Sequence, residues 1–206
     1  MYGYLDENGD ELIPAIYQWV SNFDESGYAV AVKDKLFGFI NRMGNVVIPF
    51  QYENVFSLNN GIAAVQKDGK VGYINMQNKV LVPFSFDEAY ETVNDLALVR
   101  MGTYWGYINR KGKVIIPWQF EAAQAFSEGK AWVKLSGKYG LIDERGKYLL
   151  PFKYDNAFPF QQGFAKVQLD GKWGLVNEYG VEIIPPVCEQ IGSIYKNKFV
   201  AKTTSV

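Results

Sequence analysis

The amino-acid sequence repeats itself at an interval of 34 residues, with one extra residue in the first copy. A glycine opens each copy, and in five of the six copies an aromatic residue precedes it. Such a period is the signature of a tandem-repeat architecture, in which each unit buries its apolar face against its neighbours. Six units account for residues 1–206, which we expect to form a single domain. Their approximate bounds are 2–36, 37–70, 71–104, 105–138, 139–172 and 173–206.

Each copy reads as a β-hairpin. In the fourth copy, "YWGYIN" is rich in strand-forming residues and leads through "RKG" into "KVIIP". An Asn or Asp opens the turn in every copy, and a Gly stands three residues later except at Asn78. This pattern predicts a hairpin loop with one left-handed residue, stabilised by the Asx side chain. A proline lies eleven residues after each opening glycine. We expect it to end the second strand, because it cannot donate a ladder hydrogen bond.

A third strand completes each unit. About ten residues such as "YENVFSLNNG" follow the hairpin and are too mixed for a strand and too short for a helix, so we expect an ordered connection. A segment such as "IAAVQK" then predicts a strand, and "KDGK" predicts a tight turn into the next copy. Each sheet is therefore expected to be a three-stranded antiparallel meander, in which the third strand of one unit pairs with the next hairpin. No stretch has the 3.6-residue period of a helix.

The two ends of the chain bear on the architecture. The first hairpin (residues 2–14) and the last strand (Lys198–Thr203) would together complete a sixth sheet. We therefore expect an all-β fold and favour a closed six-bladed propeller-like array. The alternative is an open β-solenoid or superhelix of the same units with those two segments as caps, its edge protected by Lys196, Lys198 and Lys202.

The repeated motifs resemble a known family. "DGKWG", "DGKVG" and "SGKYG", followed by a Gly turn, an Ile-Pro end and "Y-D/E-x-A", resemble the bacterial WG repeat, also called the KWG repeat. The resemblance covers the whole chain, although only Trp105 and Trp173 supply the tryptophan of the name. It implies a bacterial β-repeat module with no shared catalytic reaction. The signature positions are Gly38, Gly72, Trp105, Gly106, Gly140, Trp173, Gly174, Pro49, Pro83, Pro117, Pro151 and Pro185.

Composition narrows the function. Lys and Arg total 21 against 22 for Asp and Glu, so the basic excess typical of nucleic-acid binders is absent. Histidine is also absent, which excludes Ser-His-Asp, Cys-His and histidine-metal sites. Cys188 occupies an aromatic column of the repeat and is expected in the core. We expect no enzyme activity, cofactor or metal. Without a signal peptide or an apolar run long enough to span a bilayer, we expect a cytoplasmic chain with no membrane insertion.

One column of the repeat is acidic in five of six copies. The structural interpretation is that each carboxylate caps backbone N–H groups of the connection that follows it. The functional interpretation is a set of acids facing a basic partner or a cation such as Ca²⁺ or Mg²⁺. The column contains Gln18 and the acids Glu53, Asp87, Glu121, Asp155 and Glu189.

Trp118 shares the position after the proline with Phe50, Phe84 and Phe152 and is expected in the core, which leaves two tryptophans outside the aromatic columns of the repeat. Trp19 aligns with mostly polar residues in the other copies, and Trp132 aligns with a variable column. An indole in such a column predicts an exposed binding residue, whereas the alternative is local packing between sheets. Our first hypothesis is a non-catalytic bacterial scaffold that binds another protein through Trp19 and Trp132. The second is a carbohydrate- or cell-envelope-binding module, and the third is a small hydrolase with paired carboxylates.

Overall fold

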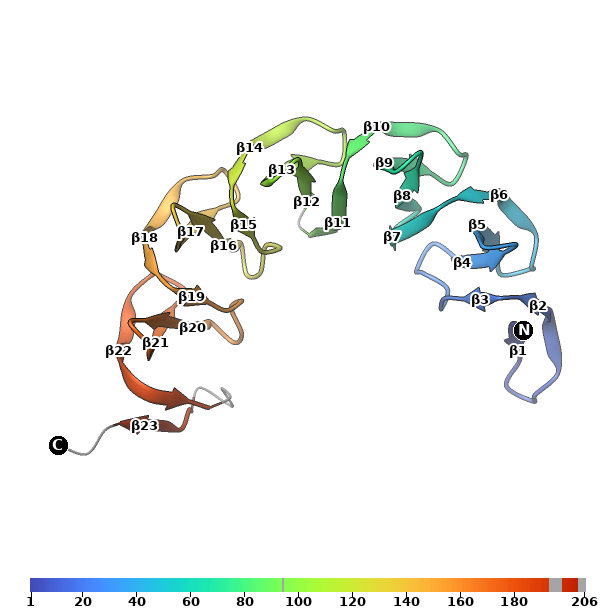
Figure 1. Ribbon diagram of the computed structural model, residues 1–206. Coiled ribbons are helices and arrows are strands. Elements are labelled where there is room, and N and C mark those ends of the chain that lie inside the picture. Colours follow the sequence, from blue (N-terminus) through green and yellow to red (C-terminus); the bar gives the residue numbers. More distant parts are fainter. Residues whose placement is uncertain (94, 193–197, 204–206) are drawn as a thin grey trace. The chain divides into compact units, whose positions relative to one another are not determined.

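The computed structural model describes residues 1–93, 95–192 and 198–203, whose regular secondary structure consists of β-strands (Figure 1). The chain divides into two compact units. Unit 1 contains Met1–Thr92, Val99–Gly102 and Asn109–Lys113, and unit 2 contains Val93–Leu98, Thr103–Ile108 and Val114–Val206.

The described residues form 23 strands. In chain order they are β1 (Tyr2–Leu5), β2 (Glu11–Tyr17), β3 (Trp19–Val20), β4 (Tyr28–Lys33), β5 (Leu36–Asn41), β6 (Val46–Tyr52), β7 (Asn54–Asn59), β8 (Ile62–Lys67), β9 (Lys70–Asn75), β10 (Val80–Phe86), β11 (Glu88–Val93), β12 (Leu96–Met101), β13 (Tyr104–Asn109), β14 (Val114–Phe120), β15 (Ala122–Ala123), β16 (Lys130–Leu135), β17 (Lys138–Asp143), β18 (Tyr148–Tyr154), β19 (Asn156–Ala157), β20 (Phe164–Leu169), β21 (Lys172–Asn177), β22 (Glu182–Ile191) and β23 (Ala201–Thr203).

The strands form six sheets, in each of which consecutive strands are neighbours: β1–β2, β3–β6, β7–β10, β11–β14, β15–β18 and β19–β23. The expected pairing of a third strand with the next hairpin is confirmed, for example by the antiparallel pairing of β4 with β5. The expectation of only three strands per sheet is wrong, because the four sheets from β3 to β18 have four strands each and the β19–β23 sheet has five. The connection supplies the added strand, because its first residues run beside the third strand of the same copy.

The ends of the chain do not pair as predicted. In the described residues, β1 pairs with β2 alone, while β23 pairs with β22 in the last sheet. The sixth-sheet pairing expected of a closed array is therefore wrong. The reason is that β22 continues to Ile191, so its free edge is close to β23 in the sequence. β23 pairs with this edge, with Ile191 opposite Ala201. Ile191 and Phe199 also join the apolar cluster around Leu175 and Cys188.

The glycine and proline of the repeat act together at a bulge. The three residues of β13 from Trp105 to Tyr107 face the five residues of β14 from Ile116 to Phe120. Pro117 lies inside this bulge, where a missing ladder donor is tolerated, so the expectation that proline ends the strand is wrong. A Cβ on Gly106 would lie only 2.7 Å from the Ile116 carbonyl oxygen, so glycine is needed for close backbone approach. The same register shift occurs opposite Gly3, Gly38, Gly72, Gly140 and Gly174.

The hairpin turns form as the sequence predicts. In the fourth copy, Asn109 Oδ1 accepts the N–H groups of Lys111 and Lys113 at 3.0 Å each. In the third copy, Asn78 replaces glycine with φ +59°, and its Oδ1 accepts the Tyr52 hydroxyl at 2.6 Å. The Asx side chain makes the same two backbone contacts at Asp6, Asn41, Asn75, Asp143 and Asn177.

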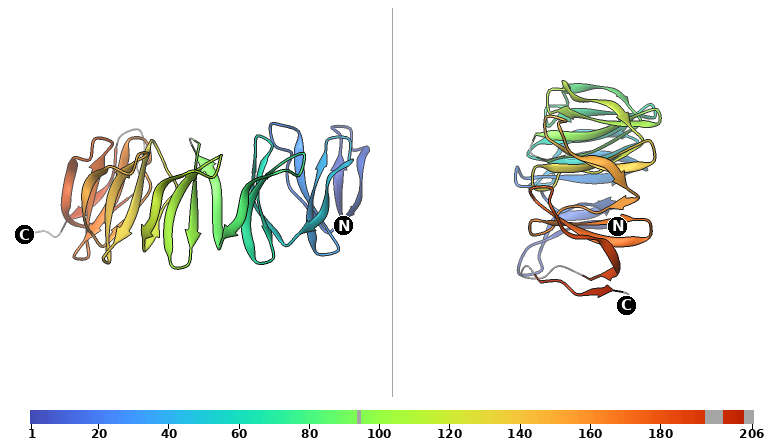
Figure 2. Two further views of the ribbon diagram at one scale, coloured as in Figure 1. Left: turned by 90° about the horizontal axis from the view of Figure 1, so that it is seen from above. Right: turned by 90° about the vertical axis from the view of Figure 1, so that its left-hand side faces the viewer.

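Within each unit, successive sheets lie face to face (Figure 2). Apolar side chains pack between them. One such cluster in unit 1 joins Phe39 and Ile48 of the β3–β6 sheet to Val65 and Ile74 of the β7–β10 sheet. The aromatic column of the repeat is buried throughout, and Cys188 is buried in the same position, as expected. Its members are Tyr17, Tyr52, Phe86, Phe120, Tyr154 and Cys188.

Candidate functional site

The acidic column supports the fold, but through a different contact from the one predicted. Glu53 Oε2 accepts the N–H of Gly69 at 3.0 Å, and Asp87 Oδ2 accepts the N–H of Gly102 at 2.7 Å. Both donors belong to two-residue turns that end a third strand, rather than to the connection beside the acid. The longer Glu side chain reaches the second turn residue, whereas the shorter Asp reaches the first. Equivalent contacts are made by Gln18, Glu121 and Asp155.

Lysines neutralise several of these carboxylates. Lys70 pairs with Asp87 at 2.6 Å, Lys138 pairs with Asp155, and Lys202 lies 3.2 Å from Glu189. The Lys138 ammonium, followed by the Asp170 N–H, holds the pKa of Asp155 below its usual value. Nor do the described residues contain a group of three or more acidic, Cys or His side chains placed to hold a metal ion. The column therefore reads as turn capping.

Trp132 lies in the core of unit 2, so the predicted exposure of its indole is wrong. It is 1% exposed, stacks on Phe160 with ring centroids 6.1 Å apart, and meets the edge of Tyr154 at 5.7 Å. The physical reason is that β16 is an inner strand of its sheet, and three consecutive residues, Ala131 to Val133, are buried. Successive side chains of β16 point to opposite faces of the sheet, and both faces are buried at this position.

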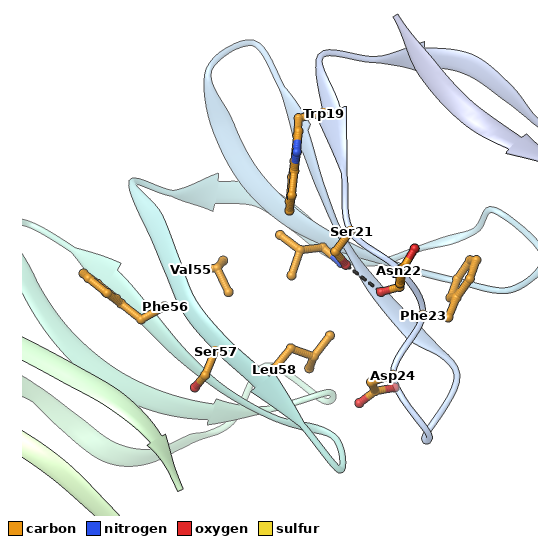
Figure 3. A pocket seen from close by; sticks show the side chains of 10 residues that line it. Trp19, Ser21, Asn22, Phe23, Asp24, Val55, Phe56, Ser57 and Leu58 are labelled. Carbon is orange, nitrogen blue, oxygen red and sulfur yellow. Dashed lines mark hydrogen bonds between the residues drawn. The ribbon is translucent and has the colours of Figure 1, made fainter. Parts of the chain in front are cut away.

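Trp19 is exposed, as predicted, and lines a pocket in unit 1. Its side chain is 45% exposed at the start of β3, a strand of two residues at the edge of its sheet. The segment after β3 forms one wall of the pocket and β7 forms the other (Figure 3). The volume is about 350 Å³. We call this the Trp19 pocket, lined by Trp19, Ser21, Asn22, Phe23, Asp24, Val30, Val55, Phe56, Ser57 and Leu58.

Backbone contacts hold the polar wall of the Trp19 pocket in place. Asp24 accepts two N–H groups, from Tyr28 at 2.9 Å on Oδ1 and from Gly61 at 3.3 Å on Oδ2. Ser21 Oγ accepts the Val30 N–H at 3.0 Å and donates to the Asn22 carbonyl at 2.7 Å. These contacts fix the position of the Asp24 carboxylate. Among the residues that line this pocket, Asp24 has the one ionisable side chain.

Unit 2 carries a row of exposed apolar side chains that sequence reasoning missed. We call it the β22 strip: Tyr179, Val181, Ile183 and Val187, which are 81%, 54%, 46% and 56% exposed. Along β22, exposure alternates from Ile183 to Val187, which places these two side chains on the outward side, while Tyr179 and Val181 belong to the turn segment just before the strand. Comparison of the repeat columns contains the signal. Three residues of the strip are apolar or aromatic in columns that are charged or polar in the two preceding copies. The strip has Tyr179, Val181 and Val187, the fourth copy has Lys111, Lys113 and Gln119, and the fifth copy has Arg145, Lys147 and Lys153.

A pocket of about 390 Å³ adjoins the β22 strip. Tyr179 and Ile183 belong to both, and Phe164 adds an aromatic wall from the start of β20. Glu178 is the one charged residue among those that line it. The full set is Gln162, Gly163, Phe164, Asn177, Glu178, Tyr179 and Ile183. The arrangement joins an exposed apolar surface to a concavity, which is the geometry of an anchoring site.

The chain belongs to the WG containing repeat family, which matches residues 2–36, 37–70, 72–102, 105–139, 139–173 and 173–203. The six matches confirm the tandem repeats expected from the sequence. No curated protein sequence matches the chain.

Solved structures resemble the fold at low sequence identity. A crystal structure of the eukaryotic initiation factor is 10% identical with a TM-score of 0.54, covering 85% of this chain and 57% of that one. Hsv2 of Kluyveromyces lactis is 9% identical with a TM-score of 0.49, covering 79% and 60%. The chain thus spans about three fifths of the length of these proteins. The likeness is to propeller-like all-β proteins and concerns the fold alone.

In the described residues, no helix is both long and apolar enough to cross a membrane.

Proposed function

We propose that this chain is a non-catalytic scaffold that binds another protein through the β22 strip and the pocket beside it. The observation that carries the proposal is the set of exposed apolar residues at Tyr179, Val181 and Val187, in columns where internal copies are mostly charged or polar. Exposed apolar patches on folded proteins mark sites of interaction. Residues that recur in every copy form the bulge, the turns and the core. Positions where the copies differ are therefore the ones available to bind a partner.

The energetics favour a protein partner at this surface. Burying one Val or Ile side chain from water contributes about 1.5–3 kcal/mol, against an association cost of about 4–15 kcal/mol. The side chains of the β22 strip are 46–81% exposed, so each contributes the corresponding fraction of this amount when a partner covers it. Tyr179 is of a residue type enriched at interface hot spots, and it forms part of the pocket wall where a partner side chain would insert.

The test uses substitutions that the repeat itself already tolerates. Tyr179→Lys and Val187→Lys introduce the residues that other copies carry at Lys111 and Lys153. The double variant should keep the thermal stability of the original chain and lose its protein partner in quantitative affinity purification. The matched control is Gln119→Lys, which places a lysine in the repeat column of Val187 but on β14. This variant should keep the partner. Equal recovery of the partner by the double variant would contradict the proposal.

A further inference from the structure

We propose that the Trp19 pocket binds one pyranose unit of a neutral saccharide. This site is lined by residues of unit 1, whereas the residues of the protein-binding surface proposed above belong to unit 2. Trp19 supplies an accessible aromatic face on one wall, with 45% exposure, whereas Phe56 on β7 of the other wall is 38% exposed with its ring directed away from Trp19 (Figure 3). The volume of about 350 Å³ falls in the range of small-molecule pockets, roughly 300–1,000 Å³.

The lining residues match the two kinds of surface that a sugar ring presents. The negative face of an indole attracts the polarised C–H groups of a pyranose, as it attracts other positive edges. The amide of Asn22, the hydroxyl of Ser57 and the carboxylate of Asp24 offer donors and acceptors for sugar hydroxyls. Asp24 has about four lone-pair sites and uses two for backbone N–H groups, which leaves acceptor capacity on a fixed carboxylate.

Charge selects against other ligands. Asp24 is the only ionisable side chain that lines the pocket, so an anionic ligand such as a phosphate or a uronic acid would be repelled. The nearby cation, Arg42, places its guanidinium over the Phe23 ring, 5.3 Å from the centroid. A wholly apolar ligand would leave the polar wall without partners on desolvation. A neutral ring with hydroxyl groups on its rim satisfies both walls.

The repeat columns predict one site per chain. The residues that align with Trp19 are Asn54, Glu88, Ala122, Asn156 and Gln190, none of which is aromatic. Saccharide binding should therefore saturate at one equivalent.

The test follows the indole N–H signals of the ¹⁵N-labelled chain by NMR during titration with chitotriose, cellotetraose, maltotetraose and 3′-sialyllactose. Ligand concentrations up to about 10 mM detect millimolar affinities. The Trp19 signal is assigned by its loss in Trp19→Phe. At least one of the three neutral sugars should shift it saturably while the Trp105 and Trp173 signals stay in place. Sialyllactose, which is anionic, should bind at least tenfold more weakly than that sugar.

Two variants separate a specific site from general exposure. Asn22→Ala should weaken the affinity about 3- to 10-fold, as the loss of one hydrogen bond predicts. Phe158→Ala removes an aromatic side chain of similar exposure (44%) in unit 2 and should leave saccharide binding unchanged. The Tyr179→Lys/Val187→Lys double variant should bind the sugar normally, so failure of this inference and failure of the proposed protein interaction are distinguishable. A Trp19 signal that no neutral sugar shifts, or that only a proline-rich peptide shifts, would overturn the inference.

Discussion

Replacing Gly106 with alanine puts a methyl group where the backbone of β14 already lies. The added Cβ would be 2.7 Å from the Ile116 oxygen and 3.0 Å from both the Pro117 carbonyl carbon and the Trp118 nitrogen. All three are backbone atoms of the bulge, so relief requires the bulge itself to move. Overpacking of this kind costs about 1–3 kcal/mol, and a rigid obstacle places Gly106→Ala near 3 kcal/mol. At roughly 2–4 °C per kcal/mol, the melting temperature should fall by about 6–12 °C.

Gly140 provides the matched control, because it occupies the same column in the next copy. There the nearest atoms are Cδ1 and Cγ of the Phe152 ring, at 2.9 and 3.0 Å, and this side chain can rotate away, while the nearest backbone atom, the Leu150 oxygen, lies at 3.1 Å instead of 2.7 Å. Gly140→Ala should therefore cost nearer 1 kcal/mol, or about 2–4 °C. Thermal unfolding followed by circular dichroism measures both variants. If Gly106→Ala melts with Gly140→Ala, or with the unmodified chain, the argument from backbone contact fails.

Substitutions at three further positions, Trp132, Asp155 and Asn78, test the core, the acidic column and the turn exception. Trp132→Ala should lower stability by about 3–5 kcal/mol in denaturant unfolding, and Trp132→Phe by clearly less, since in the described residues the indole N–H has no hydrogen-bond partner to lose. The pKa of Asp155 is lower in the folded state than its usual value of 3.8, so its stabilising contribution is present above pH 3.8 and is lost as the pH falls through the folded-state pKa. The melting temperature measured between about pH 6 and pH 3 should therefore depend less on pH in Asp155→Asn. Asn78→Ala should lower the free energy of unfolding by about 1–3 kcal/mol because it leaves the Tyr52 hydroxyl without its acceptor. In the double variant Tyr52→Phe/Asn78→Ala, the free energy of unfolding should recover part of that loss.

Local chemistry was predictable from the sequence because it depends on residues close together in the chain. The Asx turn at Asn109 and the left-handed backbone of Asn78 follow from side-chain reach and backbone sterics alone. The role of Pro117 was not predictable in the same way. A missing donor is compatible both with a strand end and with a bulge, and only the register of β13 against β14 distinguishes them.

Surface exposure was predictable only in part. Trp19 and Trp132 both replace variable residues, yet Trp19 begins an edge strand while Trp132 sits on an inner strand packed on both faces. That difference depends on how sheets stack, which no single column records. The β22 strip could have been found in the sequence, because columns that are mostly charged or polar in the internal copies become apolar in the last copy, but a search for periodicity favours what recurs over what differs.

Backbone hydrogen exchange of the chain alone and in complex with its purified protein partner tests the central claim most directly. That claim is that recurring columns build the fold and differing columns bind. Binding should slow exchange in residues 179–187 of the last hairpin and leave the equivalent residues 111–119 of the fourth copy unchanged. Protection of 111–119 without protection of 179–187 would contradict it.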